Sequence, residues 1–159
     1  MTVEIKGANE LIAVFREIED FLKDEKPMQG IVDDIADLVQ TKTEKGLDYR
    51  SRKFEPYSPA YAKKKGTSRA NLKDTGKMLD AIDTKVLNAN HGKVFVESRS
   101  YTGKGKRART DMVAQIHNTG TGKQPEREFM NITPSALKKL KKKHYDDPLL
   151  KITRKARLR

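Results

Sequence analysis

Three histidines, His91, His117 and His144, are the side chains in this chain best suited to acid–base catalysis or metal binding. They lie far apart in the sequence, without the spacing that is typical of metal ligands. As a general base, His117 would need a positioned acid and a nucleophile, and the sequence identifies neither. The chain has no cysteine, which excludes thiolate nucleophiles, Cys-ligated metals and disulfides. These residues therefore indicate no catalytic centre.

Glycine-rich motifs with known chemistry are also missing from the sequence. Gly-Lys pairs occur at 76–77, 92–93, 103–104, 105–106 and 122–123. None has the earlier glycine and the following Ser or Thr of a phosphate-binding loop. No Gly-x-Ser-x-Gly nucleophile elbow occurs either. We therefore predict that the protein is not an enzyme and that it uses no cofactor or metal.

Charge is unevenly distributed over the 159 residues, whose net charge is +12. Residues 1–47 carry a net charge of −5, whereas residues 136–159 carry +8. Such a division could steer the basic part toward nucleic acid. It could also favour head-to-tail contact between identical subunits, or it could serve solubility alone. No apolar run approaches the roughly 18 residues that cross a bilayer, and no apolar signal-peptide centre follows the first methionine. We predict no membrane association.

Two amphipathic helices are expected near the N-terminus. The first spans residues 8–24, with an apolar face formed by Leu11, Ile12, Phe15, Ile18, Phe21 and Leu22. The second begins near Pro27 and ends near Gly46, with apolar residues again at steps of three and four. The alternation around Val3 and Ile5 predicts a short strand before them.

The rest of the chain predicts a small antiparallel sheet and a basic end. Residues 48–73 are expected to be extended, with one helical turn over 61–65, and a short helix is expected over 72–82. Strands are expected around 84–86, 94–96 and 129–132. The Gly-rich basic segment 99–110 is expected to be a loop, and Met112, Val113 and Ile116 are expected in the core. A last helix should start at Thr133-Pro134 and fray over 146–159.

Together these elements predict an α+β fold with two long N-terminal helices packed on a small antiparallel sheet. We expect one domain over residues 1–135, followed by a basic C-terminal helix and flexible tail over 136–159.

Basic segments offer an alternative function. Lys63–Lys65, the Lys-rich C-terminus and the loop cations could all contact phosphates without reading sequence. The cations of that contact loop are Arg99, Lys104, Lys106, Arg107 and Arg109. No helix-turn-helix, zinc finger or aromatic RNA-binding signature accompanies them. The alternative is a basic nucleic-acid-binding protein without sequence specificity.

Four short patterns follow one another between residues 50 and 133. They are Phe54-Glu-Pro56-Tyr57-Ser58-Pro59, then Leu72-Lys-Asp-Thr75-Gly76-Lys-Met78-Leu79-Asp-Ala-Ile82, then Val113-Ala114-Gln-Ile116-His117-Asn-Thr-Gly120, and last Arg127-Glu-Phe129-Met130. In this order they resemble the Mu-like phage virion morphogenesis family, also called tail completion proteins. The layout is similar, more loosely, to phage head–tail joining proteins. Ala81 stands where the family has Ser, and Met130 where it has Leu.

The resemblance implies a phage or prophage virion assembly protein that completes the tail or joins it to the head. Implied with it are a ring-shaped homo-oligomer, tail or connector proteins as partners, and non-specific contact with DNA. Such a protein would reside in the cytoplasm of the bacterial host during assembly and then in the tail or neck. The candidate assembly residues are those of the patterns: Phe54, Pro56, Tyr57, Ser58, Thr75, Gly76, Met78, Ile82, His117, Gly120, Arg127 and Phe129.

Structural roles are expected for several of these residues on physical grounds alone. Thr75 should cap the helix that follows it, while Gly76 permits close packing. His117 should bond the backbone across the turn that Gly120 makes. Arg127 and Phe129 should lie on adjacent faces of a strand, with one side chain out and one in.

Overall fold

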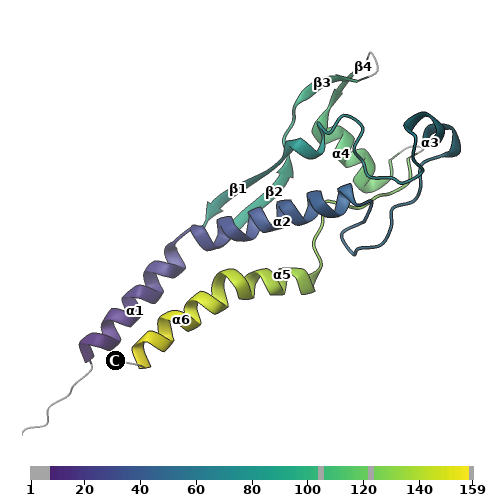
Figure 1. Cartoon of the computed structure of the whole chain (residues 1–159). Coiled ribbons are helices and arrows are strands. Elements are labelled where there is room, and N and C mark those ends of the chain that lie inside the picture. Colours follow the sequence, from purple (N-terminus) through teal and green to yellow (C-terminus); the bar gives the residue numbers. More distant parts are fainter. Residues whose placement is uncertain (1–7, 104–105, 122–123, 158–159) are drawn as a thin grey trace, which may run out of the picture.

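The computed structural model describes residues 8–103, 106–121 and 124–157, and it has the α+β architecture expected from the sequence (Figure 1). The strand expected around Val3 and Ile5 lies outside the described residues. Helices α1 (Ala8–Lys23) and α2 (Lys26–Glu44) follow each other end to end. Pro27 sits in the first turn of α2, where its missing N–H costs nothing. Both N-terminal helices are confirmed.

The first hairpin packs on α2. Strands β1 (Ile82–Asn88) and β2 (His91–Val96) are antiparallel, with Ile82 opposite Val96. They lie along α2 (Figure 1), and α1 packs instead against the C-terminal helix α6 (Asp147–Arg157). A Cβ on Gly92 would lie 2.6 Å from Cγ1 of Val32, so glycine allows this close approach of strand and helix.

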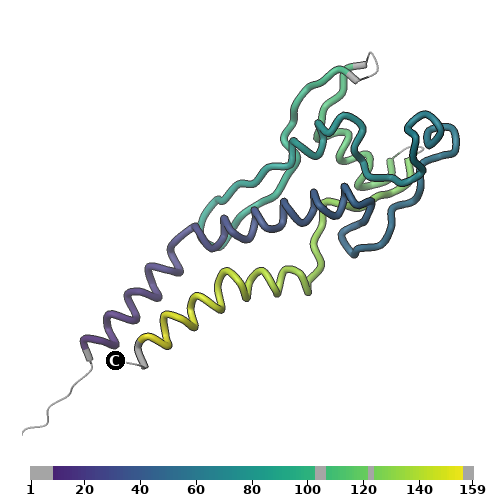
Figure 2. Tube along the Cα trace, viewed as in Figure 1, coloured from purple at the N-terminus to yellow at the C-terminus, as the bar shows by residue number. Residues whose placement is uncertain are grey.

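The C-terminal part is one long helical rod. Helix α5 (Pro134–Lys141) continues through a π-helical segment (Lys142–Asp146) into α6 (Asp147–Arg157). Figure 2 shows this rod running back beside α2 and α1. The hydroxyl of Thr133 caps α5 by accepting from the amide of Ala136 at 3.2 Å, as predicted. No helix in the described part of the chain is long and apolar enough to cross a membrane.

The expected fraying over 146–159 is wrong for the described residues up to Arg157. Helix α1 supplies a packing surface for α6, which the thin apolar stripe of the C-terminal segment did not reveal. Ile152 of α6 is 8% exposed, and the ring of Phe21 meets that of Tyr145 edge to face at 6.1 Å. The division of the chain at residue 135 stays a prediction.

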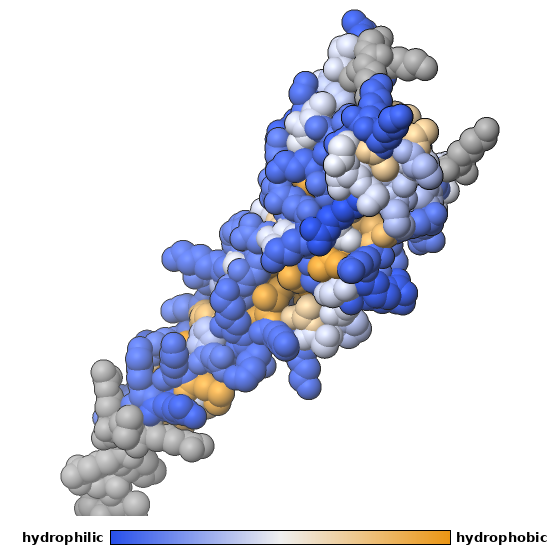
Figure 3. Space-filling view, turned by 45° about the vertical axis from the view of Figure 1, so that its right-hand side comes forward, coloured by the Kyte–Doolittle hydropathy of each residue, from blue (hydrophilic) through white to orange (hydrophobic). Residues whose placement is uncertain are grey.

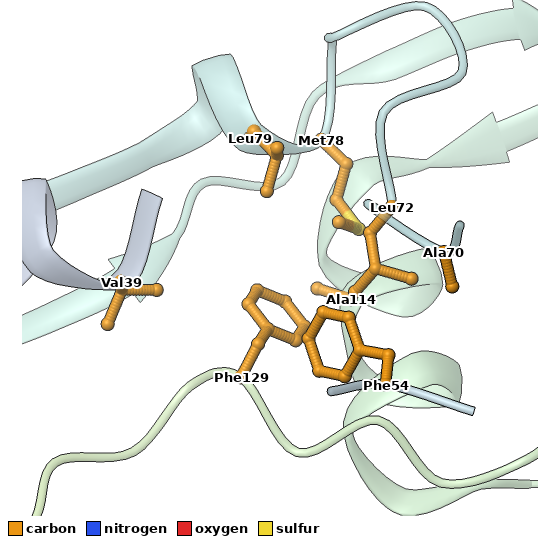
Figure 4. Packing of buried hydrophobic residues seen from close by; sticks show 8 residues of the cluster. All are labelled: Val39, Phe54, Ala70, Leu72, Met78, Leu79, Ala114 and Phe129. Carbon is orange, nitrogen blue, oxygen red and sulfur yellow. The ribbon is translucent and has the colours of Figure 1, made fainter. Parts of the chain in front are cut away.

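The main core lies where α2, the loop before β1, helix α4 (Thr110–Thr119) and the chain near Phe129 meet (Figure 4). Phe129 and Leu79 are each 1% exposed. Around them pack Val39, Phe54, Ala70, Leu72, Met78 and Ala114. The buried ring of Phe129 packs against segments that are far apart in the sequence. Burial of a large aromatic ring stabilises such contacts.

Two segments of the middle region differ from their prediction. The helix expected over 72–82 is only the 3₁₀ turn η1 (Leu79–Ala81), because Leu72 and Gly76 have left-handed backbones with φ of 51° and 82°. The loop expected over 99–110 contains a second hairpin, β3 (Ser100–Gly103) and β4 (Lys106–Arg109). Thr110, 1% exposed, anchors its base: the Arg99 amide donates to the Thr110 hydroxyl at 2.8 Å.

Three other predictions need correction. Helix α4 (Thr110–Thr119) turns Val113 and Ala114 to the core, but Met112 and Ile116 are 54% and 36% exposed. Residues 129–132 form no strand, because the amides of Phe129 and Met130 donate to the Asn118 side chain instead of a ladder. The turn expected over 61–65 is a longer helix, α3 (Pro59–Lys65), which Gly66 ends with a φ of 74°.

Candidate functional site

A cavity of about 850 Å³ lies beside the main core, at the end of the molecule that holds α3. Its wall combines the chain around Tyr57, the loop before η1, Tyr101 of β3, α4, and the chain at 124–127. Eight predicted assembly residues line it: Pro56, Tyr57, Ser58, Thr75, Gly76, Met78, His117 and Arg127. Of the other four, Phe54 and Phe129 are in the adjacent core, Ile82 packs against that core, and Gly120 ends α4.

Arg127 is the central residue of this wall, and it is only 3% exposed. Its Nε and Nη2 donate to the Glu55 carbonyl oxygen at 3.1 and 3.0 Å, and Nη2 is 3.4 Å from the Pro56 carbonyl oxygen. Its guanidinium carbon is 5.5 Å from the centroid of the Tyr57 ring. Burial lowers the pKa of Arg127 from its usual value, against the opposing influence of Tyr57 and Glu55.

The expectation that Arg127 points outward and Phe129 inward is therefore wrong, because both side chains are buried. A buried guanidinium needs acceptors, and the turn at Glu55 and Pro56 supplies backbone carbonyls. Arg127 thereby fastens the chain at 127 to the chain at 55.

Tyr57, Tyr61 and Lys65 form another part of the cavity wall. The rings of Tyr57 and Tyr61 meet edge to face, with centroids 4.9 Å apart. Lys65 Nζ lies 5.2 Å from the Tyr57 centroid and 5.8 Å from that of Tyr61, and it donates to the Lys73 carbonyl oxygen at 2.6 Å. Cations at such distances are attracted to the ring faces. The side chains of Tyr57, Tyr61, Lys65 and Arg127 therefore hold one another in place.

His117 places a largely buried imidazole on the same wall. Its Nδ1 is buried and has no hydrogen-bond partner among the described residues. Burial, with a smaller contribution from the charge of Arg127, lowers the pKa of His117. The backbone bond expected of this side chain is not formed by the ring; instead, the carbonyl oxygen of His117 accepts from the Arg127 amide at 2.8 Å. Gly120 closes α4 in the left-handed conformation, with φ of 66°.

Thr75 and Gly76 line the cavity from the loop before η1. Thr75 is exposed and begins no helix, so the predicted cap is wrong. The carbonyl oxygen of Gly76 accepts from the Asp80 amide at 3.0 Å. The positive φ of Gly76 makes this tight turn accessible to glycine at little cost.

The predicted basic contact loop is partly neutralised within the chain. Arg99 pairs with Glu97 at 2.5 Å, and Arg109 pairs with Asp111 at 2.6 Å. Arg107 is exposed on β4. Lys104 lies outside the described residues, and Lys106 lies on β4.

Sequence reasoning missed Tyr61, Lys65 and Tyr101 as parts of this site. The spacing of Tyr57, Tyr61 and Lys65, each four residues after the last, was an available signal for side chains on one face of a helical turn. Tyr101 gave no such signal, because β3 brings it to the cavity from a segment expected to be a loop. Lys77 Nζ lies 5.5 Å from the Tyr101 centroid and extends the same pattern.

Compared with known proteins, the chain matches no family model, no curated protein and no solved structure. The cavity combines tyrosine rings with the cations Lys65 and Arg127, each of which donates a hydrogen bond to a backbone carbonyl oxygen. Such a surface is suited to binding another molecule.

Proposed function

We propose that this chain is a non-enzymatic assembly protein of a phage or prophage virion, acting in tail completion or head–tail joining. The observation that carries the proposal is the convergence of four short sequence patterns, spread over residues 54 to 130, on one cavity and its adjacent core. Patterns that resemble one family and also form one structural unit support a common origin better than scattered matches would.

Ring oligomerisation is the mechanism we propose, and the surface of α1 supports it. Leu11, Ile12 and Phe15 are 55%, 48% and 60% exposed, and Leu22 follows at 45%. Figure 3 shows apolar surface at the end of the molecule where α1 and α6 lie. Exposed large apolar side chains close together on one helix are typical of protein contacts. Neighbouring subunits, or the tail and connector proteins of the particle, would cover it.

The mechanism needs no chemistry beyond docking. Helix α3, which contributes to the cavity wall, and helix α1 lie toward opposite ends of an elongated molecule (Figure 1). Contacts between unlike surfaces repeat around a ring when the rotation between subunits closes. The protein would act in the host cytoplasm during assembly and stay in the tail or neck of the finished particle.

Electron microscopy of particles made without this protein tests the proposal. We expect tails without attached heads, or tails whose ends are malformed. Supplying the protein in trans should restore whole particles. The protein should also be detected in purified particles. Normal, infectious particles in its absence would contradict the assembly role.

A further inference from the structure

A second groove, of about 460 Å³, lies between the C-terminal end of α2 and the start of α5, on the side of the 47–53 turn. Three cations line it, Lys42, Arg50 and Lys139, with the hydroxyl residues Ser51, Thr133 and Ser135. No acidic residue is among the described residues that line it. The groove is thus different in kind from the cavity at Arg127, whose wall includes Glu55 and Asp74.

The turn that presents Arg50 and Ser51 is rigidly built on Asp48. Oδ1 of this buried carboxylate accepts from the amides of Arg50 and Arg52 at 2.9 and 2.7 Å, and Oδ2 accepts from Arg52 Nε at 2.7 Å. Burial raises the pKa of Asp48, but the hydrogen bonds and charge of Arg52 outweigh it and lower the pKa overall. Ser51 holds a left-handed backbone, with φ of 67°. The hydrogen bonds of Asp48 hold this turn in place without a ligand.

Two of the three groove cations, Lys42 and Arg50, are positioned by Tyr49, and none of the three is paired with a carboxylate of the described residues. Arg50 stacks on the Tyr49 ring at 4.9 Å, and Lys42 Nζ donates to the Tyr49 carbonyl oxygen at 2.7 Å. Among the described residues, no carboxylate lies within 4.0 Å of Lys42, Arg50 or Lys139. By contrast Lys73 and Lys143, on neighbouring surfaces, are each paired with a carboxylate. Converging like charges without an acid create a field that favours an anion.

The basic surface continues beyond the groove in both directions. Lys138 and Lys141 are exposed along α5, and Lys45 and Lys53 are exposed near the turn. Lys142, directly after α5, is instead paired with Asp147 at 2.5 Å. A row of cations several residues long fits a polyanion with regularly spaced charges better than a single acidic side chain. Serine and threonine hydroxyls beside the cations fit phosphate oxygens, which accept several hydrogen bonds at once.

We propose that this groove binds a phosphate of a nucleic-acid backbone, with the flanking lysines on the adjacent phosphates. Recognition would be independent of base sequence, because the groove offers contacts to phosphate and none to base edges. This site goes beyond the assembly role proposed above and does not depend on it. It also moves the nucleic-acid contact away from the hairpin at 99–110, where Arg99 and Arg109 are already paired.

Fluorescence anisotropy of a labelled DNA duplex, titrated with the full chain at several salt concentrations, tests the proposal. Arg50→Gln and Lys139→Gln should each weaken binding several-fold and reduce the log–log salt slope by about one unit. Lys64→Gln is the matched control: it removes one exposed charge from α3, outside the groove. It should change the affinity less and leave the slope nearly unaltered. Circular dichroism confirms that each variant is folded.

Three outcomes would overturn the proposal. The first is equal loss of affinity in the groove variants and the Lys64 variant, which would mean diffuse charge attraction. The second is a melting-temperature increase by inorganic phosphate that the groove variants abolish, with no duplex binding; the groove would then hold a small anion. The third is equal binding of polyglutamate and duplex. None of these bears on whether particles form without the protein, so the two proposals fail separately.

Discussion

The side chain of Arg127 holds the backbone carbonyl of Glu55, 72 positions earlier in the chain, through two hydrogen bonds of 3.1 and 3.0 Å. Only a guanidinium can present two parallel N–H groups in this fork while its plane lies near the Tyr57 ring. The contact therefore joins two of the four patterns from which function was inferred. It explains why an arginine occupies a position that is 3% exposed.

Arg127→Lys tests this fork. The ammonium of lysine cannot donate from two fixed positions, so the buried carbonyl at Glu55 loses part of its hydrogen bonding. We expect the free energy of unfolding to fall by about 1.5–3 kcal/mol, measured by urea denaturation. Arg107→Lys, at an exposed site on β4, should change it little. Equal stability of the Arg127 variant and the wild type would show that the fork does not stabilise the fold.

His117 makes stability depend on pH. Burial lowers the pKa of its imidazole in the folded state, so the unfolded chain takes up a proton at a higher pH, near the ordinary histidine value of about 6.5. More protons bound by the unfolded state means that the free energy of unfolding falls as the pH falls through that value.

The substitution His117→Gln should remove the loss of folding stability at low pH. The stability difference between wild type and variant should therefore shift in favour of the variant as the pH drops from about 8 to about 5, on either side of the ordinary histidine pKa. Thermal denaturation across that range measures it. His91→Gln, at an exposed position, controls for general effects of losing a histidine. A stability difference for His117→Gln that is constant with pH would mean that the imidazole titrates alike in both states.

Thr110 is expected to decide whether the second hairpin is ordered. Its hydroxyl donates to the Glu97 carbonyl oxygen and accepts from the Arg99 amide at 2.8 Å, at the base of β3 and β4. An isolated two-stranded hairpin is marginal in water, so its anchorage matters. Thr110→Val keeps the shape and should cost about 1–3 kcal/mol by leaving these groups unpaired.

Amide hydrogen exchange measures the effect on the hairpin directly. In the wild type we expect protection at Tyr101 and Ala108, whose strands pair, and loss of that protection in Thr110→Val. Thr102→Val, exposed on β3, should leave the protection intact. Fast exchange throughout the wild-type hairpin would contradict the anchoring role and support the loop first expected there.

The two N-terminal helices were predictable because their apolar residues recur at helical steps over long stretches, and such periodicity needs no knowledge of partners. The segments 99–110 and 146–157 were mispredicted for the opposite reason. Their order depends on contacts with other parts of the chain: Thr110 with Glu97, and helix α6 with helix α1. Neither contact leaves a local signal in the sequence.

The candidate site was predictable in part. Pattern order identified Tyr57, His117 and Arg127, and the structure brings all three to one wall. That Arg127 is buried was not predictable, because a lone arginine in a polar segment is usually exposed. The backbone carbonyls that accept its hydrogen bonds have no sequence signature. The same holds for the groove at Arg50, which depends on how Asp48 folds the preceding turn.

Packing of the C-terminal helix on α1 predicts unequal effects of two neighbouring apolar residues. Ile152 is 8% exposed and Leu150 is 49% exposed. Ile152→Ala should lower the free energy of unfolding by about 2 kcal/mol, because it removes buried methyl groups and leaves a cavity. Leu150→Ala should change it by much less. Urea denaturation measures both, and equal effects would show that α6 does not pack as the structure has it.

Gly30 and His144 are expected to be coupled across the contact between α2 and the C-terminal rod. A Cβ on Gly30 would lie 2.5 Å from Cε1 and Nδ1 of His144, whose Nε2 is 2.7 Å from Asp34 Oδ2. By helix propensity alone, Gly30→Ala inside α2 should stabilise the protein by about 1 kcal/mol. Here the new methyl group must displace the imidazole from Asp34, so we expect Gly30→Ala to destabilise the protein.

A double-mutant cycle separates the two effects. In a His144→Ala background the space is free, and Gly30→Ala should then stabilise the protein by up to about 1 kcal/mol, the helix-propensity gain. The sign of the substitution thus reverses between the two backgrounds, which a non-specific change in helix stability could not produce. Urea denaturation of all four proteins gives the coupling. If Gly30→Ala stabilised both backgrounds alike, the imidazole would not lie against Gly30, and the rod would dock on α2 in another register.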